Sequence, residues 1–315
     1  MSAVARQVAR GLPEFVEPML ARAGRPFDSS DYLFEIKWDG TRALCFADAG
    51  GVRLMNRRRR DLGRRYPELV ACLAALPRGT VLDGEVVVIG PDGKPDYHAF
   101  QRREQCRNPH DIARLSTSHP ASYVVFDQLY AAYKPYLDQR LDARRRRAAA
   151  TVRRCASASV IMSDGVVGAG KAYFEAVVAQ GLEGVVAKRL SSTYAPGKRT
   201  DAWVKIKRQE DVVCVVIGFV PEGRDDFASL VLAATDDDGN ARYVGRVGSG
   251  FDADLRATLN AFLWSHLAGG GPVVPCGDRG ARWVEPTLYC VVRCMERTAG
   301  GMLRGPVFRG LCDAD

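Results

Sequence analysis

A lysine opens the stretch Lys37-Trp38-Asp39-Gly40-Thr41-Arg42, which lies between two predicted strands, Asp31–Ile36 and Ala43–Phe46. The stretch alone fits an ordinary charged β-turn with Asp-Gly at the bend. A lysine fixed between strands can also be a nucleophile, but its amine attacks phosphorus only after losing its proton. We therefore expect cations such as Arg42 and Lys207, or a bound divalent metal, to favour the unprotonated form of Lys37.

Four later segments share one feature, a carboxylate, a cation or an aromatic ring on a predicted strand. They are Leu82-Asp83-Gly84-Glu85, Tyr123-Val124-Val125-Phe126-Asp127, Glu183-Gly184-Val185-Val186-Ala187-Lys188 and Trp203-Val204-Lys205-Ile206-Lys207. Glu85 interrupts an apolar strand, so a metal, a ribose hydroxyl or a cation is expected beside it. The second segment supplies an aromatic ring that could stack on a base. The last puts two lysines on one strand face, where they could grip a triphosphate. Each segment alone fits a surface strand, but five in this order indicate a site.

Positive charge is concentrated in short runs of the chain. The 315 residues carry a formal net charge of +8, and arginines cluster at 57–60, at 64–65 and at 144–147. Such an excess favours a polyanionic partner, because each neutralised phosphate releases counterions. A charge run taken alone, however, is more often a solvated helix face. The charge therefore favours nucleic acid without identifying it.

Cysteine usage and hydropathy point away from secreted and membrane classes. The nine cysteines include no Cys-x-x-Cys pair, which predicts reduced thiols and argues against structural zinc. No apolar signal region follows the N-terminal arginines, and the longest apolar run, Val212–Val220, is too short to span a bilayer. We expect a soluble protein of the cytoplasm.

The pattern of apolar residues predicts two domains of different texture. Up to about residue 208, helices are expected at 66–76 and 172–180, and further strands at 80–89, 121–130, 184–189 and 202–207. After a break near Arg208–Asp211, short strands are expected at 212–220, 227–235, 241–247 and 282–293. A helix should start at the N-cap Asp252, with an apolar stripe of Leu255, Leu259, Phe262, Leu263 and Leu267. Several short strands and one helix suit an OB-fold.

In their order, the five segments resemble motifs I, III, IIIa, IV and V of the superfamily of ATP-dependent DNA ligases and mRNA-capping enzymes. Other segments resemble one branch of it, the ligase domain of bacterial end-joining ligase D, from about Pro18 to Leu311. They include Pro18-Met19-Leu20-Ala21, Tyr243-Val244-Gly245-Arg246-Val247-Gly248-Ser249-Gly250-Phe251, Trp283-Val284-Glu285-Pro286 and Leu303-Arg304-Gly305-Pro306-Val307-Phe308. The resemblance implies an α+β chain. Residues 1–208 would form an adenylyltransferase (nucleotidyltransferase, ATP-grasp-like) domain of antiparallel sheets with helices, and residues 209–315 an OB-fold β-barrel.

The resemblance also implies roles for ten residues. Catalysis would fall to Lys37, the nucleophile that takes AMP from ATP, and to Lys205 and Lys207 on the α-phosphate. Nucleotide contacts would come from Glu35 at the adenine edge, Phe126 stacked on adenine, Arg42 at the AMP or nick phosphate, Arg57 on the ribose side, Glu85 and Lys188. Glu85 and Glu183 would hold the divalent ion.

The implied function is an ATP-dependent DNA ligase that uses Mg²⁺ or Mn²⁺ and seals 3′-OH/5′-phosphate nicks in duplex DNA. A lysyl-AMP intermediate would form first, and the C-terminal domain would close over ATP and then over DNA by a joint near Gln209. The protein is expected to act in DNA repair or end joining. We expect it to be a monomer in the cytoplasm, associated with the nucleoid. A Ku-like end-binding protein and separate polymerase and nuclease chains are the expected partners.

Two segments depart from the family pattern. Asn56-Arg57-Arg58-Arg59-Arg60-Asp61 replaces Ser-Arg-Asn-Gly-Lys-Asp, and the tail Gly310-Leu311-Cys312-Asp313-Ala314-Asp315 replaces Gly-Leu-Arg-Glu-Asp-Lys. The missing tail Arg and Lys predict slow lysine adenylylation, unless Arg304 or Arg309 substitutes. Two alternatives therefore stay open: an RNA ligase or capping-type nucleotidyltransferase, and a nick- or end-binding protein without catalysis.

Overall fold

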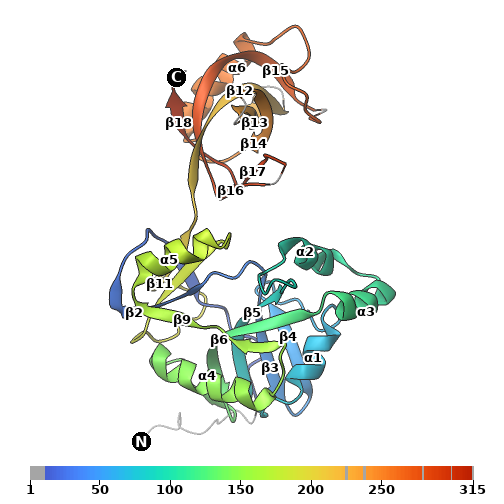
Figure 1. Ribbon diagram of the computed structural model, residues 1–315, viewed down its shortest axis with the longest axis vertical. Helices are drawn as coiled ribbons and strands as arrows, with labels where there is room; N and C mark the ends of the chain where they lie inside the picture. Colours follow the sequence, from blue (N-terminus) through green and yellow to red (C-terminus); the bar gives the residue numbers. More distant parts are fainter. Residues whose placement is uncertain (1–10, 224–225, 237–238, 279, 299, 314–315) are drawn as a thin grey trace, which may run out of the picture. The chain divides into compact units, whose positions relative to one another are not determined.

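The computed structural model (Figure 1) describes residues 11–223, 226–236, 239–278, 280–298 and 300–313. The N-terminal arginine-bearing segment before residue 11 and the last two residues of the altered tail lie outside the described residues. The chain divides into two compact units, residues 1–207 and 208–315. Within the described ranges, no helix combines the length and the apolar character needed to cross a membrane.

The first unit contains a five-stranded sheet that carries the lysine segment. Its order is β1 (Leu20–Ala23), β11 (Arg199–Lys207), β10 (Gly184–Arg189), β2 (Ser29–Ile36) and β9 (Gly165–Gly168). Only the β1–β11 pair is parallel. Helix α5 (Gly170–Ala179) packs on β2 and β10. The predicted alternation in β11 is confirmed, because Val204 and Ile206 enter this core while Trp203 enters another.

A second sheet of the same unit has the order β4 (Gly51–Asn56), β3 (Thr41–Asp48), β5 (Thr80–Val88), β6 (Ala121–Ala131) and β7 (Lys134–Pro135), with β8 (Val160–Met162) parallel to β6. One face packs on α1 (Pro67–Leu73) and α4 (Leu141–Cys155). Helices α2 (Tyr97–Gln105) and α3 (Pro109–Ser118) follow β5.

The other face of the second sheet meets residues of the first. Leu44, Phe46 and Phe126 pack there with Trp203 of β11 and with Tyr194, which precedes β11. The predicted site segments therefore converge on the space between the two sheets.

The second unit is built on a five-stranded antiparallel sheet, seen in yellow to red in Figure 1. The order is β14 (Ala241–Val247), β13 (Asp226–Thr235), β12 (Glu210–Glu222), β15 (Arg282–Cys294) and β18 (Val307–Cys312). A hairpin of β16 (Glu296–Arg297) and β17 (Leu303–Arg304) adds to it. With helix α6 (Ala253–Ser265) this is an OB-fold, so the predicted α+β class and C-terminal OB-fold are confirmed.

Helix α6 begins where the sequence predicts, since the Asp252 carboxylate accepts a hydrogen bond from the backbone N–H of Leu255 at 2.8 Å. Leu259 and Leu263 are buried in the core. The predicted stripe is wrong at its far end, because the helix ends at Ser265 and Leu267 is 44% exposed. Phe262 instead stacks on the His266 ring, with 3.9 Å between centroids.

Candidate active site

Lys37 directly follows β2, and its backbone N–H donates to the Gly184 carbonyl of β10 at 2.8 Å. The Lys37 Nζ lies 2.5 Å from one oxygen of Glu183, and the Lys207 Nζ lies 2.6 Å from the other. The expectation was a cation beside Lys37. The structure puts the carboxylate of Glu183 in direct contact with the Lys37 side chain. Lys207 and Lys37 share this carboxylate, one lysine on each oxygen.

The glycine of the lysine segment is required by close packing. A Cβ at Gly40 would lie 2.1 Å from the carbonyl oxygen of Val86 on β5, so no other residue fits there without a shift. Gly40 lies where the chain passes from β2 of the first sheet to β3 of the second sheet. The Asp-Gly bend that suggested an ordinary turn therefore joins the two sheets beside Lys37.

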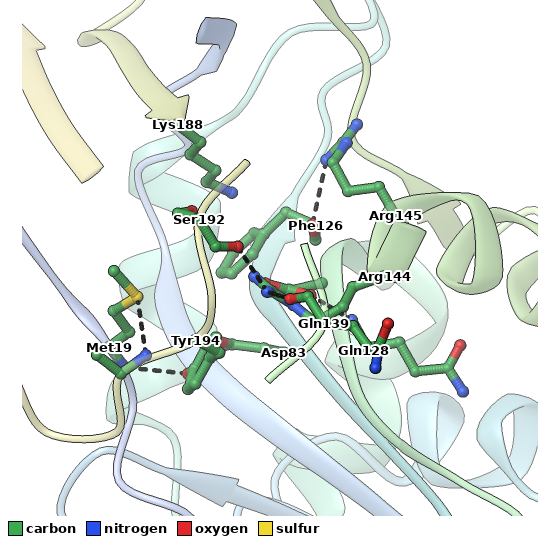
Figure 2. A network of polar contacts seen from close by, with 12 residues as sticks. Met19, Asp83, Phe126, Gln128, Gln139, Arg144, Arg145, Lys188, Ser192 and Tyr194 are labelled. Atoms are coloured by element: carbon green, nitrogen blue, oxygen red, sulfur yellow. Dashed lines mark hydrogen bonds and ion pairs between the residues drawn. The ribbon is translucent and has the colours of Figure 1, made fainter. Parts of the chain in front are cut away.

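Arg42 lies at the start of β3 and is held by a fork of hydrogen bonds. It donates to the two Asp83 oxygens at 2.9 and 2.6 Å and to the Met19 carbonyl at 2.5 Å. Tyr194 donates to Asp83 at 2.6 Å and accepts from the Met19 N–H at 3.0 Å, as Figure 2 shows in part. Burial lowers the pKa of Arg42, but Asp83 and Tyr194 outweigh it and raise the pKa overall. Arg42 is thus a fixed permanent cation.

Seven of the ten predicted residues line one cavity of about 160 Å³. They are Glu35, Lys37, Arg42, Glu85, Phe126, Lys188 and Lys205. Glu183 contacts Lys37 at the cavity wall, and Lys207 contacts Glu183. The structure therefore gathers nine of the ten predicted residues around one place between the sheets.

Two ionisable groups in the cavity wall have shifted pKa values. Burial raises the pKa of Glu85 to about 8, against the opposing charges of Lys37 and Arg42. Within the described part of the chain, no hydrogen bond or ion pair is recorded for its carboxylate. Burial, with the charges of Lys207 and Arg199, lowers the pKa of Lys205. Glu85 is thus a carboxyl group still available to a cation or a hydroxyl.

The aromatic wall of the cavity is shared with a cation. Phe126 meets Trp203 edge to face, with 5.9 Å between ring centroids. The Lys188 Nζ lies 3.8 Å from the Phe126 centroid and 2.5 Å from a Glu35 oxygen. Burial lowers the pKa of Lys188, while Glu35 acts in the opposite direction. A base stacked on Phe126 would therefore lie close to the Lys188 ammonium group.

Arg57 is the predicted residue that the structure does not bring into this group. It is exposed in the turn after β4 and lines a second cavity, of about 580 Å³. Six arginines and two carboxylates line that cavity: Arg42, Arg57, Arg58, Arg60, Arg65, Arg107, Asp61 and Glu104. Arg42 lines both cavities, so the second cavity lies beside the first. Its six arginines outnumber its two carboxylates, which gives it an excess of positive charge.

The arginine run at 144–147 is only in part a solvated basic face: Arg146 and Arg147 are exposed, whereas Arg144 and Arg145 turn inward. Arg144, labelled in Figure 2, is fully buried on α4 and donates to both Asp127 oxygens at 2.8 Å. Arg145 pairs with Glu35. No pattern in the sequence predicts these contacts or the contacts of Tyr194. Asp83 carried a signal, since it is an ionisable residue inside an apolar strand.

The donor set permits a divalent cation. The described residues contain no group of three His, Cys, Asp or Glu side chains that could hold a metal alone. Glu85 and Glu183 supply two carboxylates at the cavity, and Mg²⁺ usually combines one or two carboxylates with phosphate oxygens and water. The residues therefore fit a metal ion that arrives with a polyphosphate.

Family models match both units. The ATP dependent DNA ligase domain matches residues 17–207, and the ATP dependent DNA ligase C terminal region matches residues 223–314. DNA ligase C1 of Mycolicibacterium smegmatis is 35% identical over 308 residues, which cover 93% of this chain and 87% of that protein. The multifunctional non-homologous end joining protein LigD of Pseudomonas aeruginosa is 31% identical over 309 residues, or 95% of this chain. The chain spans only 36% of the length of that LigD.

Solved structures agree with these relatives. The structure described as mycobacterial DNA ligase D complexed with ATP and MES is 31% identical, with a TM-score of 0.56 and 96% of each chain covered. A Lig E DNA ligase at 18% identity and a TM-score of 0.64 shares the fold. The resemblance to the ligase domain of ligase D is thus confirmed. The chain belongs to the ATP-dependent DNA ligases.

Proposed function

We propose that this protein seals 3′-OH/5′-phosphate nicks in duplex DNA through a lysyl-AMP intermediate on Lys37. The observation that carries the proposal is the position of Lys37, at the wall of a cavity of about 160 Å³ that Arg42 and Lys205 also line. Lys207 lies across the shared Glu183 carboxylate. A nucleophilic amine surrounded by cations suits attack on a polyphosphate.

In the first step the Lys37 amine attacks the α-phosphorus of ATP, a P–N bond forms, and the P–O bond to pyrophosphate breaks. Glu183 holds both Lys37 and Lys207 at the cavity, at 2.5 and 2.6 Å. Lys205, Lys207 and Arg42 offset the negative charge of the transition state. A divalent ion, Mg²⁺ or Mn²⁺, would be held by Glu85 and Glu183 and would neutralise phosphate charge when bound.

The base of ATP belongs against Phe126, with Glu35 at its edge and Lys188 beside it. These three side chains line the same cavity as Lys37. In the later steps AMP passes to the 5′-phosphate of the nick, and the 3′-OH displaces AMP to close the strand. Arg57 acts in these later steps rather than at the ribose, because it lines the larger cavity.

The larger cavity suits the phosphates of the nicked strand. Its six arginines include Arg42, which also faces the nucleotide cavity. Arginine forks bind phosphate oxygens well, so a 5′-phosphate at Arg42 would continue into a backbone held by Arg57, Arg58 and Arg60.

We place the activity in DNA repair or end joining, because LigD relatives are named for end joining. The protein would act as a monomer in the cytoplasm, at the nucleoid. A Ku-like end-binding protein is the proposed partner at DNA ends.

The test is incubation with α-labelled ATP and Mg²⁺ or Mn²⁺, followed by nicked duplex DNA. Wild type and Lys134→Ala, an exposed lysine on β7, should form a labelled band that disappears as the nick is sealed. Lys37→Ala should form none. Label from GTP in place of ATP would instead favour the capping-type reading.

The altered tail keeps a second candidate in view, a nick-binding protein impaired in adenylylation. Cys312 and Asp313 stand where the family has Arg and Glu. Tight binding of nicked DNA without labelling by either nucleotide would support that candidate and reject the ligase proposal.

A further inference from the structure

We propose that Arg145 is a positioning residue for the nucleotide base: it sets the affinity for ATP and the preference for adenine without touching the nucleotide. The proposal rests on the proposed function, since it concerns the cavity beside Lys37. No role of this kind follows from the motifs, and Arg145 lies in a run of arginines that the sequence alone assigns to solvent or to a polyanion.

Arg145 projects from α4 and joins three separate segments. Its Nη1 donates to Oε1 of Glu35 on β2 and, at 3.1 Å, to the carbonyl oxygen of Phe126 on β6. Its Nη2 donates to the carbonyl oxygen of Ser163, just after β8, at 2.7 Å. Figure 2 shows the guanidinium beside Phe126. A planar guanidinium presents five N–H donors on three nitrogens in a rigid fork, whereas a lysine offers three donors from a single nitrogen.

The three segments share a second property. Glu35, Phe126 and Ser163 all line the cavity of about 160 Å³, whereas Arg145 is not among its described lining residues. The Arg145 side chain is 14% exposed and that of Glu35 is 1% exposed. Arg145 therefore lies behind the cavity wall and fixes three of its parts from outside.

Glu35 is the part on which base selection would depend most. One of its oxygens pairs with Arg145 and the other with Lys188, whose ammonium group lies over the Phe126 ring. Without Arg145, a buried carboxylate would keep a single cation, and that cation comes from inside the cavity. Glu35, already 2.5 Å from Lys188, would then lose its anchor on α4 and could move with Lys188 away from the base.

The chemistry gives this geometry a selective consequence. A carboxylate at the base edge accepts a hydrogen bond from the 6-amino group of adenine, but it repels the 6-oxygen of guanine. Misplacing Glu35 therefore weakens ATP binding and reduces the discrimination against GTP. It does not remove the lysine, the phosphate-binding cations or the metal-binding carboxylates.

The experiment compares Arg145→Gln and Arg145→Lys with Arg146→Gln, an exposed arginine on the same helix. The initial rate of labelling of Lys37 is measured against the concentration of α-labelled ATP and of α-labelled GTP. Arg145→Gln should raise the half-saturating ATP concentration by about tenfold or more while leaving the rate at saturation within about threefold. Arg145→Lys should lie between it and wild type, and Arg146→Gln should match wild type.

The ratio of ATP to GTP labelling efficiency separates positioning from a merely structural role. We expect it to fall in Arg145→Gln and to be kept in Arg146→Gln. An unchanged half-saturating ATP concentration and an unchanged ratio, with or without a lower melting temperature, would overturn the proposal. If Arg145→Gln fails to fold, Arg145→Lys decides by the same two quantities. Failure of wild type to label at all would count against the proposed function instead.

Discussion

Glu183 and Glu85 are two carboxylates at one cavity in opposite electrostatic situations. Glu183 is 7% exposed and has a lysine on each oxygen. Glu85 faces the cavity with no recorded partner among the described residues, and burial raises its pKa to about 8. A neutral or poorly solvated carboxyl group beside a proposed triphosphate site is costly to the empty protein. This unfavourable burial of Glu85 is consistent with a role of its carboxyl group in ligand binding.

The pKa of Glu85 predicts how stability depends on pH without nucleotide. Its pKa in the folded protein, about 8, exceeds the unfolded value of 4.5, so the folded state binds the proton more tightly. This group therefore destabilises the fold increasingly as pH rises from about 4.5 to about 8, by at most about 1.4 kcal/mol per pH unit. Glu85→Gln cannot ionise, so we expect it to be more stable than wild type at about pH 8.

Urea unfolding at about pH 5 and about pH 8, without ATP or metal, checks this prediction. The stability difference between Glu85→Gln and wild type should be larger at the higher pH, while labelling of Lys37 by ATP should be at least about tenfold slower. Glu175→Gln, an exposed position on α5, is the control. A variant less stable than wild type at about pH 8 would contradict the argument.

At the scale of elements, α4 is fixed to β6 by a buried ion pair. Arg144 and Asp127 are both fully buried, and Arg144 also donates to the carbonyls of Gln139 at 2.5 Å and Ser192 at 3.0 Å. Removing one partner would leave a buried charge without compensation. The pair therefore holds α4, and with it Arg145, against the strand that carries Phe126.

Asp127→Asn should destabilise the protein by about 3–5 kcal/mol, because Arg144 would remain buried and charged. The matched control is Asp111→Asn on α3, whose partner Arg114 lies 3.3 Å away with both side chains more than half exposed. It should change stability by no more than about 1 kcal/mol. The free energies of unfolding in urea give both values, and similar losses in the two variants would refute the explanation.

Several strands and the lysine segment could be predicted from the sequence, whereas helices α2, α3 and α4 were not predicted. Strands β2, β5, β6, β10 and β11 have apolar runs or clear alternation, and all lie where they were expected. The buried face of α4 does not show as an apolar stripe in the sequence, because one of its core positions is Arg144, a charged residue that pairs with Asp127. Local periodicity cannot reveal such a residue, since its partner lies on another strand.

The site could be predicted wherever a residue type stands out in its own element. Lys37, Glu85, Phe126 and Lys205 do so, and they line one cavity. Arg145 and Tyr194 do not, because their importance comes from segments far away in the chain. Arg57 was expected at the ribose from its motif, but the turn after β4 carries it to the larger cavity.

At the scale of the whole chain, the two units have separate cores. None of the clusters of buried apolar residues among the described residues mixes side chains from residues 1–207 and 208–315. Each unit therefore buries its own apolar surface, which is what an independently folding domain requires. Both proposed cavities, including the whole set around Lys37, lie in the first unit.

A chain ending at Lys207 should accordingly unfold cooperatively and gain melting temperature with ATP. We nevertheless expect it to label Lys37 about a hundredfold more slowly than the full chain, because the departing pyrophosphate needs further cations.

The family tail supplies an Arg and a Lys that this chain lacks, so Arg304 of β17 and Arg309 of β18 are the candidates to replace them. In the full chain, Arg304→Ala or Arg309→Ala should slow labelling by about tenfold or more at saturating ATP. Arg282→Ala, exposed at the start of β15, should not. Wild-type rates in both variants would mean that neither arginine replaces the missing tail. Wild-type labelling by the truncated chain would mean that the C-terminal unit serves the DNA steps alone.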